Sequence, residues 1–84
     1  MGEQQFVSLC KREVVEYVNQ LYPNIKITEN DVYVVWLCKA LQNNKALLST
    51  TVEDGMYYEI THNGDKGEMY VDAYVKAHNY TVII

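Results

Sequence analysis

The chain has 84 residues, 49% of them apolar, and a net charge of −4 from 11 acidic and seven basic side chains. A chain of this length forms one domain with one core. Its acidic balance opposes direct nucleic-acid binding, which needs clustered Lys and Arg, and no apolar run approaches the roughly 20 residues of a membrane span. The first residues also lack the pattern of a signal peptide. We therefore expect a single globular domain over residues 1–84.

The first predicted element is an amphipathic helix over residues 1–22. Apolar residues recur at spacings of three and four, with charged and amide side chains between them, which is the pattern of a helix with one buried face. Pro23 ends the helix, because the residue before a proline is disfavoured in the helical region. The apolar positions are Phe6, Leu9, Cys10, Val14, Tyr17, Val18 and Leu21.

Over residues 31–84 the apolar pattern changes to an alternation of period two, which predicts an antiparallel sheet. Three dipeptides that favour tight turns divide this region into strands: Asn43-Asn44, Asp54-Gly55 and Asn63-Gly64. The expected fold is therefore α+β, with the N-terminal helix packed on a four- to five-stranded antiparallel sheet. The range reflects the C-terminal part: YTVII at positions 80–84 predicts a last strand, whereas residues 72–79 fit either a strand or a short helix.

A strand points its side chains alternately to two faces, and one helix covers only one face of a sheet. The predicted inner face, toward the helix, carries Trp36, Cys38, Ala46, Leu48, Thr50, Val52, Met56, Tyr58, Ile60, Met69, Val71, Ala73 and Val75. The predicted outer face carries Tyr33, Val35, Leu37, Lys39, Lys45, Leu47, Ser49, Thr51, Tyr57, Glu59, Thr61, Tyr70, Asp72, Tyr74 and Lys76. The outer face thus holds an unusual number of aromatic and aliphatic side chains for a surface in water.

No catalytic, metal or cofactor site is expected from the residue types present. Cys10 and Cys38 both fall in apolar periodic segments, which indicates packed, reduced thiols rather than nucleophiles and favours a cytosolic compartment. His62 and His78 are the only imidazoles, and neither has a second ligand at metal-binding spacing. The glycines fall at turns rather than in a phosphate-binding loop. These observations indicate a protein that is not an enzyme.

Tyrosine is enriched at protein interfaces, because its ring offers a large contact area at a low entropy cost. The candidate interface residues are Tyr33, Tyr57, Tyr70 and Tyr74. They could meet a foreign protein, and the acidic stretch over residues 53–72 would suit a basic groove. They could equally meet a sister subunit, which would make the protein a homo-oligomer.

A second hypothesis concerns a small ligand at the first predicted turn. Lys39 and Lys45 flank Gln42 and Asn43, so two cations and two amides could hold a phosphorylated nucleotide while a nearby ring stacks on its base. The alternative interpretation is a plain polar hairpin tip.

The segments VVWLCK, LQNNKALLSTT, DGMYYE and NGDK resemble DUF6275, a family of small uncharacterised proteins from bacteriophages and prophages of Gram-positive bacteria. The similarity spans roughly residues 31–79, with a looser helix before it. The family has no established activity, so no site residue follows from it.

The resemblance implies a phage protein that acts in the host cytoplasm. Small phage proteins often inhibit host machinery, so by association we expect an accessory protein that binds and blocks a host defence protein. Two alternatives stay open: sequestration of a small nucleotide immune signal, and a homo-oligomeric structural protein of the phage.

Overall fold

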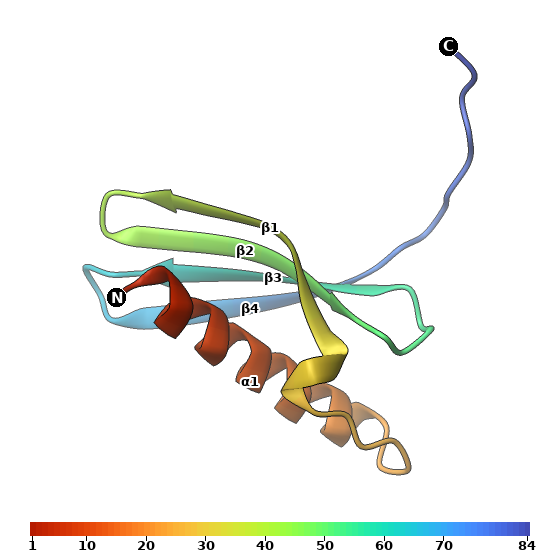
Figure 1. The fold of residues 1–84 in the computed structure, drawn as a ribbon, viewed down its shortest axis with the longest axis horizontal. Coiled ribbons are helices and arrows are strands. Elements are labelled where there is room, and N and C mark those ends of the chain that lie inside the picture. The colour runs from red at the N-terminus through yellow and green to blue at the C-terminus, as the bar shows by residue number, and fades with distance from the viewer.

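The structure is a computed structural model that describes residues 1–84 as two layers, one helix against one sheet (Figure 1). The elements are α1 (Glu3–Leu21), a 3-10 turn η1 (Glu29–Asp31), β1 (Val32–Ala40), β2 (Asn43–Thr50), β3 (Met56–Asn63) and β4 (Glu68–Val75). The strands form one antiparallel sheet in the order β1-β2-β3-β4, each beside its neighbour in sequence. The expected α+β fold is confirmed, with four strands.

The apolar face of α1 forms the centre of the core. Phe6, Cys10, Val14 and Val18 follow one another at a spacing of four, and each is 0% exposed. From the sheet they meet Ala46, Leu48, Tyr58 and Ile60, with Ile27 and Val32 at the margin. The helix ends at Leu21, directly before the Tyr22-Pro23 step, as the sequence predicts.

A β-bulge in β1 overturns the predicted alternation of that strand. The pairing with β2 shifts register between Val34 and Trp36, so one extra residue, Val35, lies in β1 opposite the regular β2. From that point every side chain changes face. Trp36 and Cys38, predicted inside, lie outside, while Leu37 packs against the core.

The first hairpin also differs from the prediction. The turn consists of Leu41 and Gln42, closed by the pair Ala40 and Asn43, and Leu41 adopts a positive φ of 55°. The Asn43-Asn44 step, predicted as the turn, opens β2 instead.

The two asparagines are used in tertiary contacts, which explains their place in the strand. The Asn44 amide nitrogen lies 3.2 Å from Nδ1 of the buried His62 on β3. Oδ1 of Asn43 accepts a hydrogen bond from the Gly64 amide at 3.2 Å. The side-chain amides therefore join β2 to β3 rather than bending the chain.

The other two turn predictions are confirmed in place. Asp54 and Gly55 lie between β2 and β3, where Gly55 has a φ of 71°. The turn between β3 and β4 begins after Asn63, whose Oδ1 accepts hydrogen bonds from the amides of Asp65 and Lys66. Gly67, with a φ of 65°, closes that turn.

The sheet stops at Val75, so the predicted fifth strand is absent from the chain's own sheet. Residues 72–75 are strand, which settles the first half of the ambiguous segment, and residues 76–84 form neither strand nor helix. They leave the end of β4 as an extended tail that runs away from the domain (Figure 1). The structure contains no helix with the length and apolar character that a membrane crossing requires.

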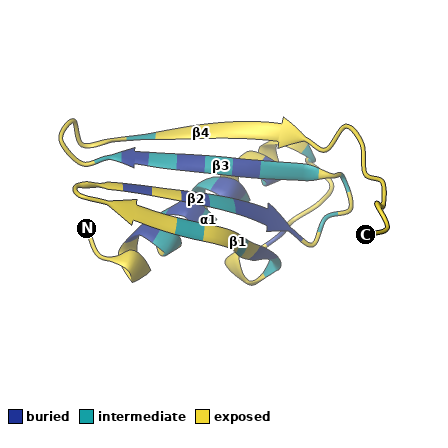
Figure 2. Ribbon diagram, turned by 90° about the horizontal axis from the view of Figure 1, so that it is seen from above, coloured by how far each residue is buried: buried dark blue, intermediate teal, exposed yellow.

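The helix leaves β4 uncovered. α1 packs across β1, β2 and the buried side chains of β3, whereas β4 is exposed at every residue except Met69 (Figure 2). Met69 is half-buried, but Val71, Ala73 and Val75, which the alternation predicts as core, lie on the helix side of the sheet in contact with solvent. The inner face of this edge strand is therefore an apolar strip without a cover.

Candidate functional site

The face of the sheet opposite α1, called the outer face here, brings side chains from all four strands into one surface. Its members are Tyr33, Trp36 and Cys38 of β1, Lys45, Leu47 and Ser49 of β2, Tyr57, Glu59 and Thr61 of β3, and Tyr70, Asp72 and Tyr74 of β4. No other part of the chain covers it. Tyr33 is 49% exposed, Trp36 41%, Tyr70 41% and Tyr74 52%.

The pairing register places the aromatic rings at both edges of the outer face. Tyr57 pairs with Tyr74, so two rings lie side by side across β3 and β4. Trp36 pairs with Leu47 of β2. The four tyrosines predicted as interface residues therefore share one face, and Trp36 enlarges it through the bulge.

The β3–β4 half of the outer face combines these rings with carboxylates. The hydroxyl of Tyr70 donates to Oε2 of Glu68 at 3.3 Å. Glu59 pairs with Asp72 across the strands, and their negative charges, Asp72 first, raise the pKa of Tyr74. For Tyr70, desolvation and then the charge of Glu68 raise the pKa. Both phenols thus stay neutral hydroxyl donors at physiological pH, beside acidic groups.

Two lysines reach this surface from its sides. Lys45 Nζ lies 3.7 Å from Glu59 Oε1, in the one salt bridge of the structure. Lys76 Nζ stands 5.4 Å from the centre of the Tyr57 ring, a cation–π contact within the chain. The contact between Lys76 and Tyr57 therefore shows that a ring of the outer face can bind a cation.

The predicted nucleotide cluster is not assembled. The bulge moves Lys39 to the helix side, where it lines a pocket of about 210 Å³ with Glu3, Leu37 and Asn44. Lys45 lies on the outer face, so the sheet separates the two cations. Gln42 lies in the turn itself, and Asn43 is bonded to Gly64.

A second pocket, of about 240 Å³, lies between α1 and the uncovered β4, lined by Glu13, Glu16, Tyr17, Gln20 and Val71. The neighbouring Tyr58 packs edge-on against Tyr17, with ring centres 5.7 Å apart, and its buried hydroxyl has no hydrogen-bond partner. Burial raises the pKa of Tyr58 to about 12, so this phenol is neutral. The pocket marks the space that α1 leaves under β4.

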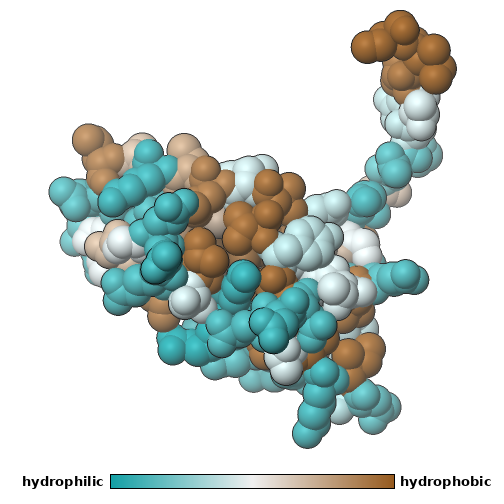
Figure 3. Space-filling model, in the orientation of Figure 1, coloured by the Kyte–Doolittle hydropathy of each residue, from teal (hydrophilic) through white to brown (hydrophobic).

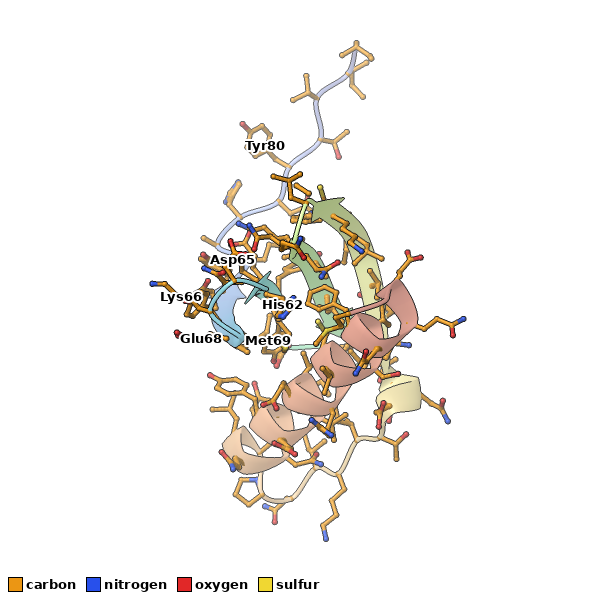
Figure 4. All side chains as sticks on the ribbon, turned by 90° about the vertical axis from the view of Figure 1, so that its left-hand side faces the viewer. His62, Asp65, Lys66, Glu68, Met69 and Tyr80 are labelled. Carbon is orange, nitrogen blue, oxygen red and sulfur yellow. The ribbon has the colours of Figure 1, made fainter.

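No group of three or more His, Cys, Asp or Glu side chains is placed to hold a metal ion. In Figure 4, His62 and its cross-strand partner Met69 lie beside the turn that carries Asp65 and Lys66 and the start of β4 at Glu68. The acidic stretch is divided between this turn, the outer face and the β2–β3 loop.

Asp54, in the β2–β3 loop, has a structural role. It accepts hydrogen bonds from the Tyr22 hydroxyl and from the Met56 amide, each at 3.0 Å. This carboxylate therefore joins the end of the helix to the start of β3.

The two cysteines should react differently with a thiol reagent. Burial, followed by the charge of Glu13, raises the pKa of Cys10 to about 12, so its thiolate is scarcely populated at pH 8. Cys38, predicted to be buried, is exposed because the bulge turns it outward. A disulfide-exchange reagent at pH 8 should therefore titrate one thiol per native chain and two after unfolding in denaturant. Two fast-reacting native thiols would contradict the buried position of Cys10, and Cys38→Ser should abolish the native reaction.

Sequence reasoning missed Trp36 and Cys38 as outer-face residues and the uncovered inner side of β4. No turn-forming residue marks the bulge, because VYVVWL reads as an uninterrupted strand. One feature of the sequence could have indicated the exposure of β4. A helix with a single apolar stripe is narrower than a four-stranded sheet, so it leaves part of the sheet uncovered.

Comparison with known proteins identifies a family for this chain. The model of a family described as "Family of unknown function (DUF6275)" matches residues 7–84. No curated protein and no solved structure matches the chain.

Proposed function

We propose that this chain, which belongs to DUF6275, a family of unknown function, is a non-enzymatic binding protein that docks another protein on its outer face. The observation that carries the proposal is the row of exposed aromatic rings on a sheet face that nothing in the chain covers. Large apolar patches on small soluble domains mark interaction sites more often than they are left in water. Tyrosine and tryptophan are also the residues that dominate binding energy at such sites.

The partner best suited to this face presents arginine or lysine side chains among apolar ones. The phenol hydroxyls of Tyr70 and Tyr74 lie beside carboxylates, and of the acidic groups on the face Glu59 alone is in a salt bridge. A guanidinium group can stack on a ring while it donates to the neighbouring carboxylate. The chain's net charge of −4 would favour the approach of such a basic partner.

We further propose that the chain is a phage or prophage protein that acts in the host cytoplasm by covering a functional surface of a host defence protein. This finer proposal is supported by the resemblance of the VVWLCK, LQNNKALLSTT and DGMYYE segments. A protein without chemistry of its own can inhibit only by occupying a surface. The nucleotide-binding alternative loses its candidate site, since Lys39 and Lys45 lie on opposite sides of the sheet.

The test is affinity capture from host lysate with matched baits. The wild-type chain should retain one protein in stoichiometric amount, and Tyr70→Ala/Tyr74→Ala should retain at least tenfold less, because both rings are exposed and lie in the acidic half of the face. Leu41→Ala is the matched control: it removes an apolar side chain that is 92% exposed but lies in a turn outside the face.

Circular dichroism must show that all three baits are equally folded. Equal capture by wild type and the double variant would remove the outer face from consideration. Capture of no stoichiometric protein would contradict the binding function itself. A raised salt concentration should weaken capture, because charge complementarity contributes to it.

A further inference from the structure

The C-terminal tail, residues 77–84, has the composition of a strand but no strand to pair with. Tyr80 is 76% exposed, Val82 68% and Ile83 89%, and Ile84 is fully exposed. Residues 79–84 carry no charged side chain, no glycine and no proline, and Thr81 to Ile84 are all β-branched. Figure 3 shows this apolar end standing clear of the domain. Such a segment pairs readily with any open sheet edge.

The sheet has two edges, and only one of them is open. The edge at β1 is interrupted by the bulge between Val34 and Trp36, a common means of blocking edge-to-edge pairing. The edge at β4 is regular. All eight residues from Glu68 to Val75 pair in unbroken register with β3, without a bulge, a proline or a lysine. Every backbone group on its free side is therefore available to another strand.

The side chains of β4 also match an added apolar strand. On the helix side Val71 is 41% and Val75 65% exposed, and Val71 lines the pocket that α1 leaves open. In an extended tail, Tyr80, Val82 and Ile84 share one face and Thr81 and Ile83 the other. Each face of the tail therefore carries an isoleucine that can cover this apolar strip.

The chain's own tail does not reach its own β4. The Lys76 amide donates to the Gly55 carbonyl at 2.7 Å, which holds the chain in line with β4 beyond the end of the strand. From there the tail runs on, away from the sheet (Figure 1). Pairing with its own edge would require a reversal within residues 77–79 that the structure does not contain.

We infer that two copies of this chain exchange their tails, so that residues 80–84 of each add a fifth strand to the β4 edge of the other. Each copy carries both a donor strand and an open edge, so a two-fold arrangement satisfies both at once and closes. A foreign protein on the edge would leave the tail bare, whereas a second copy covers both features. In this arrangement the fifth strand that the sequence predicts comes from the partner copy. It does not depend on the proposed function, which uses the outer face.

The test compares the full chain with Val82→Lys/Ile84→Lys by sedimentation and by hydrogen exchange. The wild type should sediment as a dimer, with slow exchange at β4 and residues 80–84. The variant should sediment at half that mass, with faster exchange in both segments and an unchanged rate at the α1 amides. Leu41→Lys places a new charge at a turn outside the β4 edge and should remain dimeric.

Two results would overturn the inference. One is a wild-type chain that stays monomeric at the highest concentration of the sedimentation series; slow exchange in the tail of such a monomer would show that the tail pairs with its own β4. The other is a double variant that remains a dimer, which would place the contact between copies elsewhere.

Discussion

Replacing Leu48 by alanine should destabilise the fold by about 2–5 kcal/mol, whereas replacing Trp36 by alanine should cost only about 1 kcal/mol. Leu48 is 0% exposed in the middle of the core, so its truncation removes buried surface and leaves a cavity under α1. Trp36 is the larger side chain, but it is 41% exposed on the outer face. The order of the two effects therefore reverses the order of side-chain size.

The measurement is chemical denaturation at one fixed protein concentration, with equal slopes for wild type and variants. Leu41→Ala, at a side chain that is 92% exposed, serves as the control and should stay within about 0.5 kcal/mol. If Trp36→Ala destabilised as much as Leu48→Ala, Trp36 would lie in the core and the bulge in β1 would be absent. Tryptophan fluorescence offers an independent check, since an exposed indole is quenched by a soluble quencher in the native state.

The helix and the general plan of the sheet could be predicted because each rests on a local pattern. Apolar residues recur along α1 at spacings of three and four, which predicts a helix with one buried face, and the Tyr22-Pro23 step ends it. Asp54-Gly55 and Asn63-Gly64 favour turns wherever they occur between strands. The inner faces of β2 and β3 follow from simple alternation, and both are buried as expected.

Three of the errors of the prediction have tertiary causes. The bulge at Val35 is visible only in the pairing of β1 with β2, and no residue within VYVVWL indicates it. Asn43 and Asn44 are good turn residues, but their amides are bonded to Gly64 and His62 on another hairpin. The segment YTVII has strand propensity, yet a strand needs an edge to pair with, and that edge is absent from the chain's own path.

The candidate site shows the same division between local and tertiary information. Alternation within β3 and β4 places Tyr57, Tyr70 and Tyr74 on the outer face, as predicted. Lys39 was predicted on the outer face, but it follows the bulge and lies on the helix side. The same shift places Trp36 on the outer face. The bulge therefore has two effects. It adds an aromatic ring to the outer face, and it interrupts the β1 edge, so that β4 is the single regular edge of the sheet.

Gly64→Ala should destabilise the domain by about 1–3 kcal/mol, the cost of overpacking a close contact. A Cβ at this position would collide with the backbone carbonyl oxygen of Gln42, so neither atom can yield by a side-chain rotation. The Gly64 amide also donates to Asn43 Oδ1 at 3.2 Å, which holds the two hairpin tips together. The substitution must therefore push the β3–β4 hairpin away from the β1–β2 hairpin and stretch that hydrogen bond.

Two other glycines separate this collision from ordinary backbone effects. Gly2 is the N-cap residue of α1, and a Cβ there meets nothing within 4 Å. Gly2→Ala should therefore change the free energy of unfolding by no more than about 0.5 kcal/mol, since the weaker N-cap is offset by a less flexible unfolded chain. Gly67→Ala meets no atoms within 4 Å either, but its φ of 65° should cost about 1 kcal/mol of strain. Chemical denaturation of all three variants would separate the collision at position 64 from backbone strain. Hydrogen exchange at the amide of residue 64 would report whether its hydrogen bond to Asn43 is weakened. A Gly64→Ala variant as stable as Gly2→Ala would mean that the two hairpin tips do not touch, and the close approach of Gln42 would have to be abandoned.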